Sequence, residues 1–273
     1  MTSPTDITRD PFRLVVLDMA GTTVADGGLV EQAFSAAAQR LGVRPGSDEH
    51  VRQLAYVRAT MGESKISVFR HLFAAEGGDG GEDGEDGEDK AQRANSAFED
   101  AYGELVDAGR IAPVPGAREA VERLASEGRT VVLTTGFARP TQDAVLAALG
   151  WQDLVPLTLC PADAGGRGRP FPDMVLAAFL RTGAVGDVRR TVVAGDTSYD
   201  MLSGVRSGAG IVAGVLTGAH DKDRLTRHGA THVLGSVAEL PDLIARAEAA
   251  GLPDLAARAE SAGPPAAAAR AEA

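Results

Sequence analysis

One cysteine, Cys160, is the whole thiol content of this chain of 273 residues. A disulfide within the chain is therefore excluded, which is typical of proteins in a reducing compartment, and we expect Cys160 to be a small buried residue at a strand end. No apolar run approaches the length of a membrane span, and the polar N-terminal segment lacks the hydrophobic core of a signal peptide. These absences predict a soluble, cytoplasmic protein with no membrane partner.

Aromatic residues are also scarce, at 4% of the chain, and acidic residues outnumber basic ones to give a formal net charge of -11. The core should therefore consist mainly of Val, Leu and Ala, as in helices packed on a parallel sheet. The acidic balance argues against nucleic acid as a partner. It permits a small anionic substrate, because a metal and local positive groups can hold one.

Short apolar runs alternate with helical patterns over most of the chain. We expect strands at residues 14–17, 130–133, 154–159, 191–194, 210–216 and 231–234. We expect helices at residues 117–126, 141–149, 172–181, 199–207 and 236–249. This alternation predicts an α/β fold with a Rossmann-like, doubly wound parallel sheet, in which ligands bind outside the carboxyl ends of the strands.

The stretch of residues 28–113 breaks this alternation, because it shows helical patterns and no strand signal. We expect its helices at residues 29–41, 48–61, 65–75 and 91–108. An all-helical insertion directly after the first strand predicts a cap over the edge of the sheet. The domains would then be a core of residues 11–27 and 114–250, a helical cap of residues 28–113, and an Ala-rich tail of residues 251–273.

An acidic repeat, GGDGGEDGEDGEDK, occupies residues 77–90 inside this insertion. Repeated Gly-Glu-Asp cannot build a core, so we expect a disordered, solvated loop. A calcium loop is the alternative. It would need oxygen ligands at alternate positions, and the sequence does not keep that spacing.

Carboxylates follow two of the expected strands. Asp18 leaves the first strand and enters a tight loop, Met19-Ala20-Gly21-Thr22-Thr23, whose backbone N–H groups can approach an anion. Asp196 and Asp200 follow the fourth strand and are four residues apart, so a helix starting there would place both near one side. Hard oxygen ligands of this kind suit Mg²⁺.

Two further groups can bind an anion. Thr134-Thr135-Gly136 supplies a hydroxyl and backbone amides at the end of the second strand. Arg169 precedes Pro170-Phe171-Pro172, where the prolines fix the backbone at an expected helix start. Its guanidinium can meet phosphate oxygens in a planar, bidentate way.

Taken in order, DMAGTT, TTGF, GRPFPDM and GDTSYDM resemble the four motifs of the haloacid dehalogenase superfamily. Within it they look most like the phosphonatase-like hydrolases, the group of phosphonoacetaldehyde hydrolase, and the helical insertion is similar to the cap of that group. The match runs from Leu14 to about Ala249. The resemblance implies a hydrolase in which Asp18 is the nucleophile and forms an aspartyl-phosphate. It also implies magnesium ligands: Asp18, the backbone carbonyl of Ala20, Asp196 and, directly or through water, Asp200.

The resemblance assigns the anion-binding roles as well. Thr135 would bind phosphoryl oxygens, and Arg169 would screen the nucleophile from the transferring group. We expect Thr22 and Gly136 to contact the substrate too. A carboxylate and a phosphate repel each other, so attack requires a metal and a cation between them. Relatives of this group often pair through the cap, so a homodimer is a further expectation.

The sequence departs from the superfamily pattern at Ala20. Most phosphatases of the superfamily carry a second Asp there, which protonates the leaving alcohol and then activates water. Phosphonatases also have Ala at this position, because their leaving group is a carbon stabilised as an enamine.

A second departure concerns the amine that forms this enamine. The phosphonatases place a Schiff-base lysine in the cap, and the corresponding position here is Ala59, in Val57-Arg58-Ala59-Thr60-Met61-Gly62. Lys65 is the candidate substitute if the chain bends at Gly62, whereas our expectation is a solvated lysine at a helix start. Arg58 is a candidate contact for a substrate anion, with surface packing as the alternative.

Three functions therefore remain open. The favoured one is Mg²⁺-dependent hydrolysis of a small phosphorylated or phosphonate compound through an aspartyl-phosphate. The second is cleavage of a P–C bond with a relocated lysine. The third is a catalytically weak phosphate-binding regulatory module, against which the retained nucleophile argues.

Overall fold

The computed structural model describes residues 11–74 and 87–250. The Ala-rich tail and residues 77–86 of the acidic repeat lie outside the described residues, so those two expectations stay predictions.

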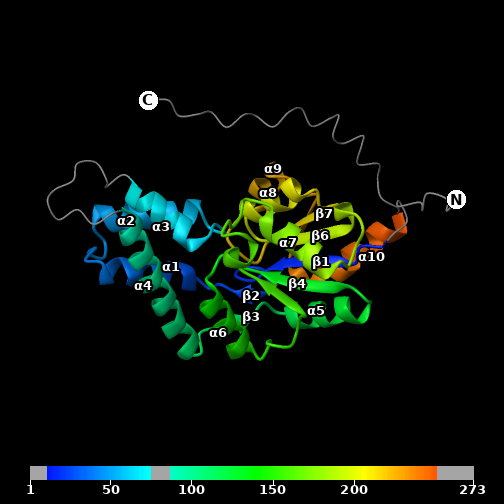
Figure 1. Cartoon of the computed structure of the whole chain (residues 1–273), viewed down its shortest axis with the longest axis horizontal. Coiled ribbons are helices and arrows are strands. Elements are labelled where there is room, and N and C mark those ends of the chain that lie inside the picture. The colour runs from blue at the N-terminus through cyan, green and yellow to red at the C-terminus, as the bar shows by residue number, and fades with distance from the viewer. Residues whose placement is uncertain (1–10, 75–86, 251–273) are drawn as a thin grey trace.

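A parallel sheet of six strands forms the centre of the fold, in the order β5-β4-β1-β6-β7-β8 (Figure 1). The strands are β1 Leu14–Asp18, β4 Thr130–Thr134, β5 Leu157–Leu159, β6 Thr191–Gly195, β7 Ile211–Val215 and β8 His232–Leu234. From β1 the chain first builds β4 and β5 on one side and then β6 to β8 on the other. The order therefore reverses beside β1, and ligands of open α/β sheets bind at such a reversal. The expected strands are confirmed. The third is shorter than expected because Leu154 closes a turn, in which its N–H donates to the carbonyl oxygen of Trp151 at 3.1 Å, and because Pro156 has no N–H to donate.

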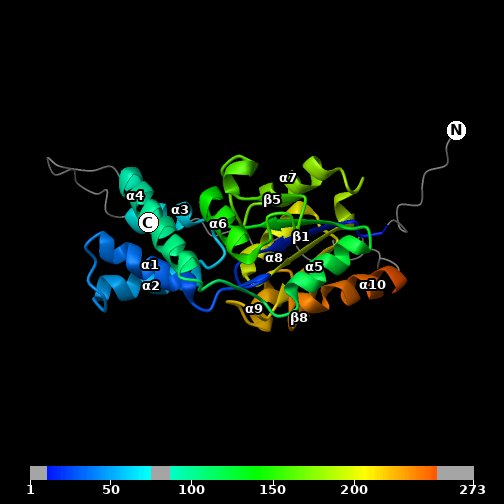
Figure 2. The same ribbon diagram turned by 90° about the horizontal axis from the view of Figure 1, so that it is seen from below.

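Helices cover both faces of this sheet, as Figure 2 shows for α7 on one side and α5 and α10 on the other. Val15 and Leu17 pack with α5, α6 and α10, whereas Leu14 and Val16 pack with α7. The helices are α5 Ala117–Ser126, α6 Arg139–Leu149, α7 Asp173–Thr182, α8 Ser198–Ser207, α9 Lys222–Arg227 and α10 Leu240–Ala250. This arrangement confirms the doubly wound α/β fold.

A segment of four helices lies beside the sheet, at its left in Figure 1. These are α1 Leu29–Arg40, α2 Asp48–Ala59, α3 Lys65–Ala74 and α4 Gly87–Asp107. Two short strands flank it, β2 Val24–Ala25 and β3 Ala112–Pro113, and they pair antiparallel. The expectation of a strand-free insertion is therefore wrong at β3. This strand pairs with β2 at the place where the chain enters and leaves the helical segment. The division into a core and a cap domain stays a prediction.

Helix α4 begins four residues before the expected start. Residues 87–90, predicted as part of a disordered acidic loop, form its first turn. Glu88 accepts hydrogen bonds from Arg70 on α3, the shortest at 2.7 Å. Acidic residues also stabilise the first turn of a helix through its dipole. The prediction missed these residues because the partner Arg70 lies on another helix.

Aromatic rings are concentrated in the helical segment, although the chain has few of them. Phe34, Phe69, Phe98 and Tyr102 form one buried cluster there. Phe137, which follows β4, joins it with its ring centroid 4.5 Å from that of Tyr102. The Val/Leu/Ala core that we expected thus describes the sheet, and rings join the helical segment to it.

Replacing Phe98 by Ala should destabilise the protein by about 3–5 kcal/mol, because the ring is fully buried at the centre of this cluster. The exposed Leu180→Ala is the control and should change the free energy of unfolding by less than about 0.5 kcal/mol. Denaturant unfolding measures both. Similar small effects for the two variants would show that the ring cluster does not hold the helical segment to the sheet.

Candidate active site

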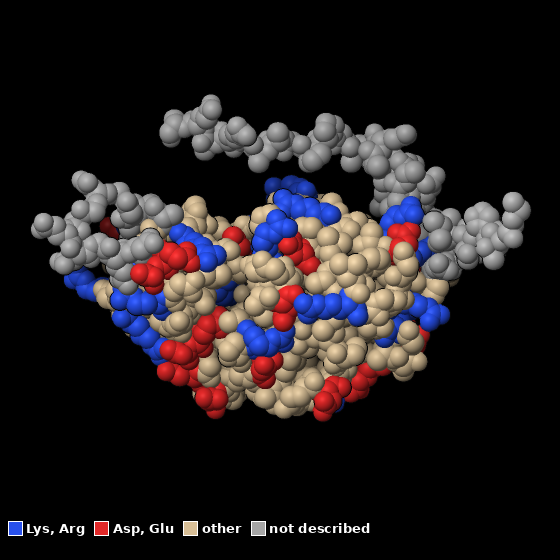
Figure 3. Space-filling view, in the orientation of Figure 1, with Lys and Arg blue, Asp and Glu red and all other residues tan. Residues whose placement is uncertain are grey.

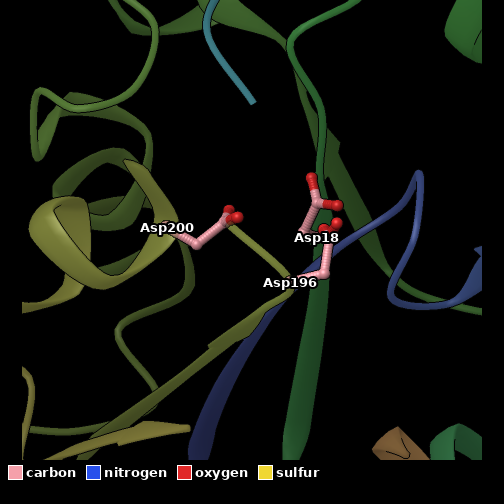
Figure 4. A group of neighbouring side chains, drawn as sticks. All are labelled: Asp18, Asp196 and Asp200. Carbon is pink, nitrogen blue, oxygen red and sulfur yellow. The ribbon is translucent and has the colours of Figure 1, made fainter. Parts of the chain in front are cut away.

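Three carboxylates meet at the carboxyl end of the sheet, beside the reversal of strand order. Asp18 is the last residue of β1, Asp196 follows β6, and Asp200 lies in the first turn of α8. Each offers an oxygen within 4.8 Å of the others, and all three are buried (Figure 4). Asp196 and Asp200 lie near each other, as expected, although only Asp200 belongs to α8, which starts at Ser198. The strand end and the helix start converge.

Close backbone approach allows the acids to meet. Gly21 has a φ of 86°, and a Cβ there would lie 2.5 Å from Asp196 Oδ2. Asp196 Oδ2 also accepts a hydrogen bond from the backbone N–H of Ala219 at 2.7 Å. The loop that follows β1 thus packs directly on the loop that carries Asp196.

A single guanidinium bridges two of the acids. Arg169 is 5% exposed, and its Nη1 lies 2.7 Å from Asp18 Oδ1. Its Nε lies 2.7 Å from Asp200 Oδ1, and its Nη2 donates to Thr134 Oγ1 at 2.6 Å. The sequence analysis assigned no separate role to Thr134, whose hydroxyl orients this cation.

The acids carry more negative charge than Arg169 neutralises. Burial raises the pKa of Asp18 well above its ordinary value, with Arg169 acting in the opposite direction. Burial and then the Asp200 carboxylate raise the pKa of Asp196 to about 7. A divalent cation would remove this repulsion, and hard carboxylate oxygens are the donors that it prefers. The residues present therefore fit a divalent metal.

A cavity of about 470 Å³ opens beside the acids. Thr135, Gly136 and Ala20 line it, together with Asp18 and Arg169. These predicted residues are thus brought together around one space.

Thr22 is placed differently from the prediction. It is fully buried, it does not line this cavity, and its hydroxyl donates to Asp196 Oδ1 at 3.3 Å. The predicted substrate contact is therefore not present. Instead the Thr22 hydroxyl holds the Asp196 carboxylate in place.

The loop between α2 and α3, residues 60–64, closes the cavity from the side of the helical segment. Gly62 has a φ of 96°, and a Cβ there would overlap the Thr197 hydroxyl. A Cβ at Gly136 would lie 2.9 Å from the carbonyl oxygen of Glu63, and one at Gly168 would lie 2.9 Å from Ser64 Cβ. The loop thus contacts three loops at the carboxyl end of the sheet.

Our expectation that Lys65 is solvated is wrong. It is only 6% exposed and lines the cavity. Its Nζ lies 5.5 Å from the ring centroid of Phe137 and 6.0 Å from that of Phe98. The left-handed turn at Gly62 separates α2 from α3 and turns Lys65 inward. Burial lowers the pKa of its ammonium group.

Arg58 lines the same cavity on its outer side. Its Nη2 lies 2.7 Å from Glu31 Oε2, and its side chain remains 61% exposed. Arg58 thus pairs with a carboxylate of α1. The sequence analysis did not single out Glu31 or Asp26, which both line the cavity. The Asp-Gly-Gly run at residues 26–28 was the available signal that the chain passes there from the sheet to the helical segment.

Cys160 is buried directly after β5, as expected. Within the part of the chain that the structure describes, no helix has the length and apolarity to cross a bilayer. On the face drawn in Figure 3, basic and acidic side chains are interspersed. The absence of a nucleic-acid partner stays a prediction.

Comparison with known proteins identifies the class of this protein. The model of the haloacid dehalogenase-like hydrolase family matches residues 12–208. The chain therefore belongs to this family and is a hydrolytic enzyme, which confirms the resemblance of its motifs.

Particular relatives are more distant. A phosphonoacetaldehyde hydrolase of Nitratidesulfovibrio vulgaris is 28% identical over 212 residues, covering 76% of this chain and 73% of that protein. One of Hahella chejuensis is 26% identical over 284 residues and covers 88% of each. The solved phosphonoacetaldehyde hydrolase-like protein of Oleispira antarctica superposes with a TM-score of 0.72 at 24% identity, over 91% of this chain and 97% of that one. This likeness confirms the fold.

The raised pKa of Asp196 predicts how stability depends on pH without a divalent cation. Between its ordinary value of 3.8 and about 7, folded Asp196 keeps a proton that the unfolded chain has released. The unfolding free energy of the wild type, relative to that of Asp196→Asn, should therefore fall as the pH rises through this window. Mg²⁺ should restore it at pH 7.

Denaturant unfolding in chelator at several pH values measures this difference. Asp143→Asn, whose carboxylate is 61% exposed, is the control and should follow the wild type. Parallel pH profiles for the wild type and Asp196→Asn would contradict the raised pKa.

Proposed function

We propose that this hydrolase is Mg²⁺-dependent and acts on a small phosphorylated or phosphonate compound through an aspartyl-phosphate on Asp18. The observation that carries the proposal is the position of Asp18. It ends β1, faces the cavity, and lies in contact with Arg169 inside a buried acidic cluster. Phosphoryl transfer asks the protein mainly for positioning and charge stabilisation, and this cluster can supply both when it holds a divalent metal.

The first step is attack by a carboxylate oxygen of Asp18 on phosphorus. The bond from phosphorus to the leaving group breaks, and the leaving group takes the electron pair. Arg169 and the amides near Gly136 compensate charge on the phosphoryl oxygens, and the Thr135 hydroxyl orients them. When bound by Asp18, Asp196, Asp200 and the Ala20 carbonyl, Mg²⁺ supplies the positive charge that lets two anions approach.

Residues 28–113 would act as the cap. The loop at residues 60–64 already packs on the loops that carry Gly136, Gly168 and Thr197. A substrate in the cavity would therefore be enclosed between the sheet and the helical segment, away from bulk water. Arg58 and Glu31, at the outer side, would contact the part of the substrate farthest from phosphorus.

Asp18→Asn should reduce phosphate release by at least about 10³-fold, because an amide oxygen cannot form the covalent intermediate. The assay uses Mg²⁺ with phosphonoacetaldehyde and a panel of phosphate monoesters, and it reads released phosphate. Asp143→Asn serves as the matched control, since that carboxylate is exposed and outside the cavity. Turnover that survives in Asp18→Asn would refute the nucleophilic role.

P–C cleavage is a second candidate, and the burial of Lys65 in the cavity favours it. Its amine would condense with an aldehyde, with loss of water, to give an imine. Transfer of phosphorus to Asp18 would then leave the electron pair of the P–C bond on carbon as an enamine. The names of the relatives support this substrate class.

Borohydride tests this candidate directly. If P–C cleavage occurs, borohydride added with phosphonoacetaldehyde should inactivate the wild type and attach the carbon skeleton to Lys65, as seen by peptide mass spectrometry. Lys65→Arg should be resistant. Ester turnover without such trapping would leave phosphate-ester hydrolysis as the function.

A further inference from the structure

We propose that Lys65 is the general acid and base of ester hydrolysis, in the place of the carboxyl group that Ala20 lacks. This inference rests on the proposed function, and it adds a catalytic residue that the four motifs do not contain. It follows from a chemical requirement, from the groups available around the cavity, and from the environment of the ammonium group.

The requirement is a proton for the leaving oxygen. An alkoxide is a poor leaving group unless a nearby acid protonates it as the P–O bond breaks. Ala20 has only a methyl group, so the acid must come from another residue around the cavity.

Lining residues other than the acidic cluster offer few protons. Arg58 and Arg169 keep theirs at all ordinary pH values. Both oxygens of the Glu31 side chain accept hydrogen bonds from Arg58, at 3.0 and 2.7 Å. Both oxygens of Asp26 also accept hydrogen bonds, Oδ2 from the backbone N–H of Gly28 at 3.1 Å and Oδ1 from that of Val30 at 3.2 Å. Of the ionisable residues that the structure places around this cavity, this leaves Lys65.

The ammonium group of Lys65 has no fixed protein partner. Among the described residues, no hydrogen bond or ion pair holds its Nζ, although the residue is only 6% exposed. Its Nζ lies over the aromatic rings of Phe98 and Phe137. The charged groups that act on it are more distant: Asp26, Asp18, Glu99 and Arg169. A buried ammonium group that contacts rings instead of carboxylates is free to bind a ligand oxygen. Burial also lowers its pKa, which makes it a stronger acid at neutral pH.

The proton balance closes over one turnover. As Asp18 bonds to phosphorus, the ester oxygen takes the electron pair of its P–O bond and a proton from Lys65, which releases an alcohol and leaves a neutral amine. Water then attacks the phosphorus of the aspartyl-phosphate, and the Asp18 carboxylate departs with its electron pair. The Lys65 amine takes the proton from that water, so the ammonium group and the carboxylate are both restored.

The backbone holds Lys65 against the loop that follows β4. The N–H of Lys65 donates to the carbonyl oxygen of Gly136 at 3.4 Å, and Lys65 begins α3. Gly136 lies in the loop that is proposed to bind phosphoryl oxygens. Closure of the helical segment would thus deliver the acid and the phosphoryl site together.

The test compares two substrates in Lys65→Met and Lys65→Arg. An alkyl phosphate such as glycerol 3-phosphate needs a proton on its leaving oxygen, whereas acetyl phosphate releases a carboxylate that does not. If Lys65 is the acid, kcat/KM for the alkyl phosphate should fall in both variants by about 10²-fold or more beyond any fall for acetyl phosphate. Lys65→Arg keeps the charge but cannot release the proton, so it should behave like Lys65→Met.

Ala20→Asp in the Lys65→Met background supplies the missing carboxyl group and should recover at least about tenfold of the lost alkyl phosphate turnover. Equal losses on both substrates, or retained alkyl phosphate turnover in Lys65→Arg, would overturn the proposal and leave Lys65 a binding or packing residue. A different result would show that the proposed function itself is wrong. In that case the wild type would release no Asp18-dependent phosphate from either substrate.

Discussion

The contact of Arg169 with Asp18 and Asp200 is the interaction on which the rest of the site depends. Three carboxylates are buried within 4.8 Å of one another, and one guanidinium reaches two of them. Without that cation, the repulsion between the acids would oppose the convergence of β1, β6 and α8. The remaining excess of negative charge is what makes the same place fit a divalent metal and, once it is bound, a phosphoryl group.

The helical segment is also packed closely against the loops at the carboxyl end of the sheet. Its loop at residues 60–64 packs so closely on Gly136, Gly168 and Thr197 that side chains are excluded at several contacts. The rings of Phe98 and Phe137 lie beside Lys65, the residue that directly follows this loop. The helical segment and the carboxyl end of the sheet thus form one closely packed interface beside the acidic cluster.

Local pattern was sufficient for the sheet and for the residues at its carboxyl end. Apolar runs marked the strands, and Asp18, Thr135 and Asp196 stood within two residues of the ends of those runs. The errors came where a distant partner decides the structure. The inward turn of Lys65 depends on Gly62 and on rings far away in the chain, and Thr22 turns to Asp196 because the fourth-motif loop packs beside it. The helical start at Gly87 likewise depends on the pairing of Glu88 with Arg70.

The central claim is a covalent bond between phosphorus and the Asp18 carboxylate. Rapid acid quenching of the enzyme during turnover of a substrate labelled in its phosphoryl group, followed by peptide mapping, tests it most directly. The account predicts a transient label on the peptide that contains Asp18, formed at least as fast as phosphate is released and absent without a divalent cation. Turnover at full rate with no labelled protein, or with label on another peptide, would contradict it.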